Sequence, residues 1–280
     1  MRTLQLLNIG SKILKKSKIS SHILDSEIIL SRVLNTTRER LLINQNIINQ
    51  KNVIRFKNQI LRRSKNEPIA YILKTKEFMG SNFYVDRKSL IPRPETELLI
   101  EPIIKIFKNR KLFFLEIGIG SGCIILSILN HLRHSQAIGI DVSKKTIKNC
   151  GINLKRFKLE NRCKVLHKSV DEINNIKFDL VISNPPYIVK RDIKRLSEDI
   201  KKYEPIIALD GGNDGLDVIK KVIYKSNEVL KLNGILALEI GYGQYKSVNN
   251  LLTANNFKEN FVIKDYKNNI RCIFSTLIKK

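Results

Sequence analysis

Apolar residues in the first 75 positions recur three or four residues apart. Three stretches carry this spacing, within residues 4–24, 28–34 and 53–61. Such spacing predicts amphipathic helices. Neither glycine nor proline interrupts the chain between Gly10 and Pro68. We therefore expect a small all-helical domain that contains no catalytic motif.

Short polar residues mark where the second and third of these helices could begin. Asp25 or Ser26 is suited to cap the second helix, and Asn49 or Asn52 the third. Side chains of this type accept hydrogen bonds from the free amides of the first helical turn. Each pair leaves two alternatives for the residue that caps its helix.

Residues 76–90 break the helical pattern. Aromatic residues flank Gly80 and two small polar residues, which predicts a short hairpin or an extended linker. A helix is then expected to open at Pro94, because proline suits the first helical position and two glutamates follow it at the positive end of the helix dipole. The expected organisation is a boundary near residue 85 and three segments: 1–75, 76–90 and 91–280.

Beyond residue 110, short apolar runs of strand length alternate with segments of helix length. This order predicts a doubly wound, mostly parallel α/β sheet. The last two apolar runs are separated only by the polar stretch 265–270, so an antiparallel hairpin is expected at one sheet edge. Helices are expected at Ser121–Leu132 and Lys144–Leu159. The predicted strands are Leu112–Glu116, Ala137–Asp141, Lys164–His167, Phe178–Ser183, Ile235–Ile240, Phe261–Lys264 and Arg271–Ser275.

The chain carries a formal net charge of +25, which changes the range of partners to be considered. A basic protein can bind nucleic acid. The lysines are spread from Lys12 to Lys280, however, among many Asn and Ile residues. A nucleic-acid site should instead gather its charge on one face. We therefore interpret the charge as compositional drift and expect no specific nucleic-acid partner.

Cysteine usage and apolar run length bear on the compartment. None of the four cysteines pairs at the spacing of a zinc site, so no metal is expected, and a reducing, cytoplasmic setting is favoured. The longest uncharged, apolar-leaning run, 117–129, is too short for a membrane span, which needs about 20 residues. The N-terminus shows no signal-like stretch, and no membrane association is expected.

A glycine-rich segment, Glu116–Gly122, lies between a predicted strand and a predicted helix. Glycines allow a tight turn there and let a ligand approach the backbone. Asp141 ends the next predicted strand, where its carboxylate can bind the two hydroxyls of a ribose. The GxGxG spacing fits a turn that binds adenosylmethionine better than one that binds a dinucleotide. A purely structural tight turn is the competing interpretation.

The segment Asn184-Pro185-Pro186-Tyr187 directly follows the strand Phe178–Ser183. Its prolines stiffen the backbone and hold Asn184 extended at the sheet edge where open α/β folds bind ligands. The Asn184 side-chain oxygen and the Pro185 carbonyl could hold the two hydrogens of a planar NH₂ group, while Tyr187 covers its face. Positioning of this kind can suffice for methyl transfer from a sulfonium. The competing interpretation is a proline-stiffened strand exit.

With these motifs in place, the chain resembles the peptide chain release factor N5-glutamine methyltransferases over nearly its whole length. The Arg93–Glu97 segment separates it from the related ribosomal-protein glutamine methyltransferases. The other shared segments are Pro68–Tyr71, Phe78 with Gly80, Ile91–Glu97, Tyr203–Pro205, Ala208–Leu209, Gly211–Leu216 and Leu238–Tyr242.

The resemblance implies a Rossmann-like class I methyltransferase domain over 91–280 and a substrate-recognition domain over 1–75. It implies methyl transfer from S-adenosylmethionine to the glutamine of the Gly-Gly-Gln motif in class I release factors. The enzyme would act as a monomer. The implied cofactor-binding residues are Gly118, Ile119, Gly120, Ser121, Gly122, Asp141, Val170 and Asn184. The implied catalytic residues are Asn184, Pro185 and Tyr187, and the implied substrate-binding residues are Asn184, Pro185, Pro186 and Tyr187.

The chain departs from the family pattern in two places. Where the family often has an acid followed by an aromatic residue near the adenine, this chain has Ser169 and Val170. We assign the adenine contact to Val170, with Ser169 or Asp171 as alternatives. Glu116 stands where the family usually has aspartate.

Two other functions compete with this one. A nucleic-acid adenine-N6 methyltransferase fits the charge, but no recognition insert or aromatic base pocket is visible, and tryptophan is absent. A non-catalytic, translation-associated binding protein is the other alternative. The intact glycine turn and the intact segment 184–187 argue against it.

Overall fold

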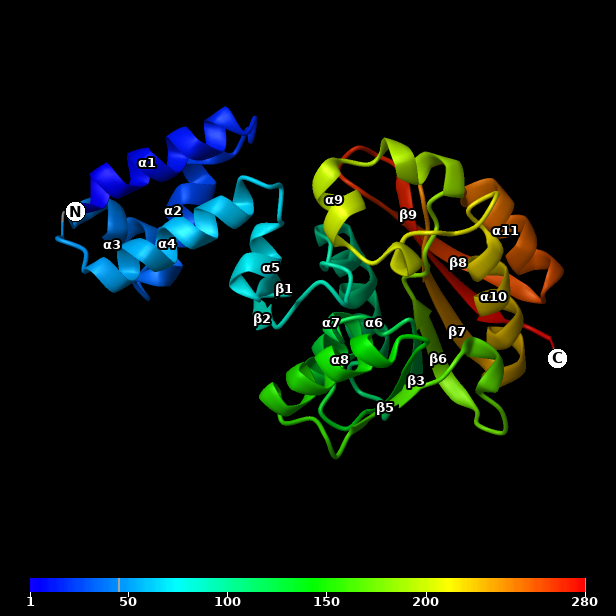
Figure 1. The fold of residues 1–280 in the computed structure, drawn as a ribbon. Helices are drawn as coiled ribbons and strands as arrows, with labels where there is room; N and C mark the ends of the chain where they lie inside the picture. Colours follow the sequence, from blue (N-terminus) through cyan, green and yellow to red (C-terminus); the bar gives the residue numbers. More distant parts are fainter. Residues whose placement is uncertain (45, 280) are drawn as a thin grey trace. The chain divides into compact units, whose positions relative to one another are not determined.

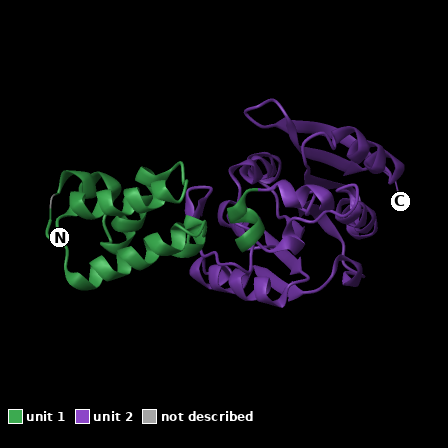
Figure 2. Ribbon diagram, turned by 45° about the horizontal axis from the view of Figure 1, so that its top comes forward, with its two compact units in different colours: residues 1–75, 197–203 green, residues 76–196, 204–280 purple. Residues whose placement is uncertain are grey.

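A computed structural model describes residues 1–44 and 46–279 of the chain. The chain forms two compact units, shown in different colours in Figure 2. Unit 1 comprises residues 1–75 together with 197–203, and unit 2 comprises 76–196 together with 204–280. Each unit is described by itself.

Unit 1 is helical and encloses an apolar core. Phe56 and Ile60 are fully buried in it, alongside leucines from the first two helices. Gly10 permits close packing, because a Cβ atom there would stand 2.6 Å from the Phe56 ring. Its helices are α1 (Thr3–Lys16), α2 (His22–Val33), α3 (Arg38–Ile43), α4 (Gln50–Arg63), α5 (Ile69–Leu73) and α9 (Glu198–Tyr203).

Helix capping in unit 1 corrects one prediction and confirms another. Helix α2 begins at His22, so Asp25 and Ser26 lie inside it and do not cap it. Both side chains make tertiary contacts instead: Asp25 pairs with Arg63 at 2.7 Å, and the Ser26 hydroxyl donates to a backbone carbonyl of α1. Asn49 does cap α4, accepting a hydrogen bond from the backbone amide of Asn52 at 2.9 Å.

Unit 2 contains the predicted doubly wound sheet, in the order β5-β4-β3-β6-β7-β9-β8. Strands β3 to β7 are parallel, while β9 pairs antiparallel with both β7 and β8 and so forms the predicted edge hairpin (Figure 1). The bounds are β3 (Phe113–Ile117), β4 (Gln136–Asp141), β5 (Cys163–His167), β6 (Phe178–Ser183), β7 (Leu230–Glu239), β8 (Phe257–Lys264) and β9 (Ile270–Leu277).

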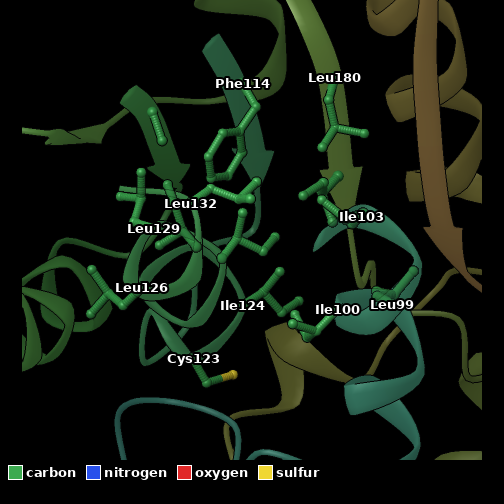
Figure 3. Close-up of a cluster of buried hydrophobic side chains, with 14 of the residues drawn as sticks. Leu99, Ile100, Ile103, Phe114, Cys123, Ile124, Leu126, Leu129, Leu132 and Leu180 are labelled. Atoms are coloured by element: carbon green, nitrogen blue, oxygen red, sulfur yellow. The ribbon is translucent and has the colours of Figure 1, made fainter. Parts of the chain in front are cut away.

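Helices cover both faces of this sheet, and side chains alternate between the two faces along each strand. Phe114 and Leu180 face α6 and α7, as Figure 3 shows, whereas their neighbours Leu115 and Val181 belong to the core under α10 and α11. Helices α10 and α11 were not among the helices expected. The bounds are α6 (Ile100–Phe107), α7 (Cys123–His131), α8 (Lys144–Arg156), α10 (Asp217–Val229) and α11 (Tyr245–Ala254).

Short elements complete unit 2. The segment after residue 75 forms a hairpin whose two turn residues, Met79 and Gly80, both have positive φ. Pro94 opens a 3₁₀ helix that leads directly into α6. The short elements are β1 (Lys76–Phe78), β2 (Ser81–Phe83) and the 3₁₀ helices η1 (Pro94–Leu99), η2 (Val170–Glu172), η3 (Lys190–Arg195) and η4 (Ile206–Ala208).

Three further observations concern the described residues. Within them, no helix is both long enough and apolar enough to cross a membrane. The four cysteines are free and buried. No cluster of His, Cys, Asp and Glu side chains in residues 1–44 and 46–279 is arranged to hold a metal ion.

Candidate active site

The glycine turn and the segment Asn184–Tyr187 meet at the point of the sheet where the chain reverses the direction in which it adds strands. The chain runs from β3 outward to β4 and β5, then crosses back to place β6 on the other side of β3. The carboxyl ends of β3 and β6 therefore lie side by side, with Ile117 paired to Ser183. Open α/β sheets bind ligands at such a switch point. The glycine turn follows β3 there, and Asn184 follows β6.

A cavity of about 270 Å³ opens at this switch point. It is bounded by the glycine turn, by the ends of β3, β4 and β6, and by segments around η1, η2 and η4. The sequence-predicted residues that line it are Gly118, Ile119, Gly120, Ser121, Asp141, Val170, Asn184 and Pro186, together with Glu116, Ser169 and Asp171.

The glycine turn leaves room for a ligand against its backbone. Gly118 and Gly120 have φ angles of +79° and +55°, a region that disfavours other residues. Apart from the chain neighbours, no heavy atom of residues 1–44 and 46–279 lies within 4 Å of where a Cβ atom would stand on either glycine. Gly122 is different, because its Cβ would stand 2.7 Å from the Cys150 sulfur, and it is not part of the cavity lining. The need for glycine at Gly122 thus comes from packing and from its own positive φ of +82°, and not from a ligand in the cavity.

Asp141 is held at the end of β4 by the turn itself. Its Oδ2 accepts from the Gly120 amide at 3.2 Å, and its Oδ1 accepts from the Ser143 amide at 2.9 Å. Burial raises the pKa of this carboxyl, and the two amides oppose that shift. Each carboxylate oxygen can accept a further hydrogen bond. Asp141 can therefore receive two hydroxyl donors from a ligand in the cavity.

Glu116 ties the turn to the following helix. Its side chain is buried, and Oε2 accepts from the Ile125 amide in the first turn of α7 at 2.9 Å. Burial raises the pKa of Glu116 well above its ordinary range. Glutamate is longer than the aspartate usual in the family, so its side chain reaches past the turn to the helix and fixes the geometry of the glycine turn.

The three candidates for an adenine contact all line one wall of the cavity. Ser169 caps η2, where its amide donates to Glu172 at 2.7 Å, and Val170 presents apolar surface beside it. Asp171 belongs to the same wall. The assignment of the adenine contact to Val170 stays a prediction.

Asn184 reaches the cavity with a defined orientation of its carboxamide. Its Nδ2 donates to the Thr96 hydroxyl oxygen at 3.0 Å. Its Oδ1 makes no hydrogen bond with the described residues, so this cavity-lining residue keeps one free acceptor. Pro186 lines the cavity as well, whereas Pro185 and Tyr187 do not.

Tyr187 is held behind the cavity wall by two charged residues. Its hydroxyl donates to Glu239 Oε1 at 3.1 Å and accepts from Arg271 Nη2 at 3.1 Å, and the guanidinium lies over the ring. Burial raises the pKa of this phenol more than any other influence does. Sequence reasoning assigned no role to Thr96, Glu239 or Arg271, although the first two lie within segments shared with the resembled family.

This fold and site define a class I methyltransferase: a mostly parallel seven-stranded sheet with an antiparallel edge pair, a glycine cradle after β3 and an acid at the end of β4. Residues 5–73 match the family model of the PrmC N-terminal domain, and residues 94–202 match the Methyltransferase small domain. A methyltransferase structure from Pyrococcus furiosus aligns with a TM-score of 0.53 and 15% identity, covering 80% of this chain and 100% of that one. This last likeness is one of fold.

Sequence relatives narrow the class to one family. The chain is 37% identical over 261 residues to the release factor glutamine methyltransferase of Clostridium acetobutylicum, covering 91% of each. It is also 37% identical to that of Clostridium botulinum, covering 94% of this chain and 95% of the relative. The chain belongs to the release factor glutamine methyltransferase family, and it is an enzyme of that family.

Proposed function

We propose that this enzyme transfers the methyl group of S-adenosylmethionine to the side-chain amide nitrogen of the Gly-Gly-Gln glutamine in class I release factors, giving N5-methylglutamine. The observation that carries the proposal is the orientation of Asn184. Because its NH₂ group is bound to Thr96, its oxygen is left to accept a hydrogen from a substrate amide. The family relationship supports the release factor as the methyl acceptor.

The residues around the cavity suit the cofactor. The open backbone at Gly118 and Gly120 would accommodate its amino-acid end, Asp141 its ribose hydroxyls, and Val170 its base. When bound, the group supplies an electrophilic methyl on a sulfonium sulfur. Ile119, Ile124 and Val170 provide an apolar lining that limits water at the site.

The chemical task of the chain is to position a weak nucleophile. An amide nitrogen has a delocalised lone pair. Pro185 is not a lining residue, but it lies between the lining residues Asn184 and Pro186. Binding one amide hydrogen to Asn184 Oδ1 and the other to the Pro185 carbonyl would aim that lone pair at the methyl carbon. Transfer would form an N–C bond and break the C–S bond, the electron pair of the C–S bond would stay on sulfur, and one amide proton would be released to solvent. No base of high pKa is required.

The parts of the chain would divide the work. Residues 1–75 would recognise the release factor, 76–90 would connect the domains, and 91–280 would carry out the transfer, with one chain sufficient for activity. Support for this division comes from the separate matches of residues 5–73 and 94–202 to two family models.

Mass spectrometry tests the proposed function directly. A class I release factor is incubated with this protein and isotopically labelled S-adenosylmethionine, then digested and sequenced. The expected product carries one labelled methyl on the Gly-Gly-Gln glutamine. A label found on another residue, or no label at all, would contradict the proposal.

The net charge of +25 is the observation that favours the competing function, methylation of adenine in nucleic acid. We expect nucleic-acid binding to be weak and independent of sequence, with a steep dependence on salt, since phosphate contacts release counterions. Methylation of the release factor should fall only gently as salt rises. Titrations of DNA and RNA by fluorescence anisotropy at several salt concentrations would measure this. Tight binding to one sequence at physiological salt would favour the adenine function.

The variant Asp141→Ala tests the ribose assignment. It removes charge-assisted hydrogen bonds, and a loss of roughly 1.5–3 kcal/mol in cofactor binding is expected. Calorimetry with S-adenosylmethionine measures the change, and Asp179→Ala provides a control, because Asp179 pairs with Lys231 outside the cavity lining. Unchanged cofactor affinity in Asp141→Ala would refute the assignment.

A further inference from the structure

Behind the cavity, buried and partly buried polar groups gather between Asn184 and Arg271. The Asn184 amide donates to Thr96, and at the other end Arg271 donates to Tyr187, which donates to Glu239. Thr96 and Glu239 are 2% and 0% exposed. The register explains the meeting: Ser183 at the end of β6 pairs with Leu238 of β7, so the residues that follow each lie next to one another.

Glu239 sets the direction of the hydrogen bonds around it. An ionised carboxylate only accepts, so every hydroxyl that faces it must donate. Tyr187 donates to Oε1. The 3₁₀ helix η1, which carries Thr96, packs against β7, which carries Glu239. Burial raises the pKa of this carboxyl, and the Thr96 hydroxyl opposes that shift. Oε2 is buried and makes no hydrogen bond with the described residues, so it is the acceptor left open toward the Thr96 hydroxyl.

The direction of the Thr96 hydroxyl in turn determines the orientation of the Asn184 carboxamide. When the Thr96 hydroxyl donates toward Glu239, its oxygen presents only lone pairs to Asn184, and a lone pair can bind the NH₂ end of a carboxamide but not the oxygen end. The opposite carboxamide orientation would place NH₂ in the cavity, facing the NH₂ of a substrate amide. Two donors cannot bind each other.

We propose that Thr96 and Glu239 are positioning residues that hold the Asn184 carboxamide with its oxygen toward the substrate amide. This inference rests on the proposed function and adds to it the device that orients Asn184. A buried carboxylate is costly to desolvate, and the residues before it in β7, Ala237 and Leu238, are apolar. Packing alone would be served by an apolar side chain at 239.

Thr96→Val and Thr96→Ser test the device. Valine keeps the shape but removes the hydroxyl, so the single-turnover rate of methyl transfer to the release factor should fall roughly 10–100-fold, since a buried NH₂ loses its partner and its orientation. Serine keeps the hydroxyl and should restore the rate to within about threefold of the wild type. Cofactor affinity, measured separately by calorimetry, should change less than about threefold. Ser275→Ala is the matched control, because its buried hydroxyl has no partner among the described residues.

The decisive measurement places Thr96→Val in an Asn184→Ala background. If Thr96 acts through Asn184, the second substitution has nothing left to orient, and it should lower the rate of Asn184→Ala by less than about twofold. Glu239→Gln should also slow transfer when Asn184 is present. The new NH₂ group can donate to Thr96 and so reverse the direction of the hydrogen bonds between residue 239, Thr96 and Asn184.

The outcomes separate cleanly. If Thr96→Val lowers the rate by the same factor with and without Asn184, the positioning role is overturned, and so it is if Thr96→Ser is as slow as Thr96→Val. If Glu239→Gln lowers only the thermal stability and leaves the rate unchanged, Glu239 has no part in it. If the wild-type protein itself transfers no methyl group to the release factor, the proposed function has failed, which is a different result from either of these.

Discussion

Asn184→Ala is expected to lower the rate of methyl transfer by roughly 10²–10³-fold, the usual effect of removing one preorganised polar contact at a reacting centre. Asn184 follows β6 directly, and its backbone is held by Pro185 and Pro186 independently of its side chain. The fold should therefore survive, and cofactor binding should weaken much less than turnover. Single-turnover kinetics and calorimetry measure the two effects separately.

Asn184→Asp sharpens this expectation. Aspartate keeps the shape and an acceptor oxygen, but it cannot donate to Thr96 and it brings a negative charge toward the sulfonium. That charge would stabilise the cationic ground state more than the transition state, so the rate should drop while cofactor affinity holds or improves. Near-wild-type rates in both Asn184 variants would show that Asn184 only shapes a turn.

Gly122→Ala is expected to destabilise the protein by roughly 2–5 kcal/mol. About 1–2 kcal/mol comes from the positive φ of +82°, and roughly 1–3 kcal/mol from overpacking against the Cys150 sulfur, 2.7 Å from the new Cβ. Urea denaturation followed by circular dichroism measures the loss in the free energy of unfolding.

Gly120→Ala is the matched comparison, because a Cβ there meets no atom of the described residues within 4 Å apart from its chain neighbours. Only the strain of its positive φ remains, roughly 1–2 kcal/mol. The new methyl group would instead occupy cavity space beside the glycine turn, so cofactor affinity should fall about tenfold or more. Equal losses of stability in the two variants, or wild-type cofactor affinity in Gly120→Ala, would contradict this division between the two glycines.

Several features of unit 2 could be predicted because their causes are local. Runs such as Phe178–Ser183 are too short and too apolar to be anything but buried strands in an alternating chain, and β6 has these bounds. The glycine turn and Asn184 were placed correctly at strand ends. Strand β7 is longer than expected, beginning at Leu230, because Asn233 with positive φ and Gly234 interrupt its apolar pattern without ending the strand.

Other features depend on residues that meet only after folding. Asp25 has the chemistry of a helix cap, yet its partner is Arg63, 38 positions away. Residues 197–203 join unit 1, where the Tyr203 hydroxyl donates to the Lys65 carbonyl at 2.8 Å. No local pattern indicates either contact, since each requires the path of the chain between the partners.

The sequence by itself therefore determined the sheet, the glycine turn and the asparagine that ends β6, because hydrophobic periodicity and backbone preference act over a few residues. Only the tertiary structure decided which residues of those motifs reach the cavity. Gly122 packs against Cys150 and Tyr187 binds Glu239, so neither lines the cavity. Asn184 does line it, and its side-chain oxygen has no hydrogen-bond partner among the described residues. The reason is physical: a side chain's partners are set by strand register and packing, which bring together residues distant in sequence.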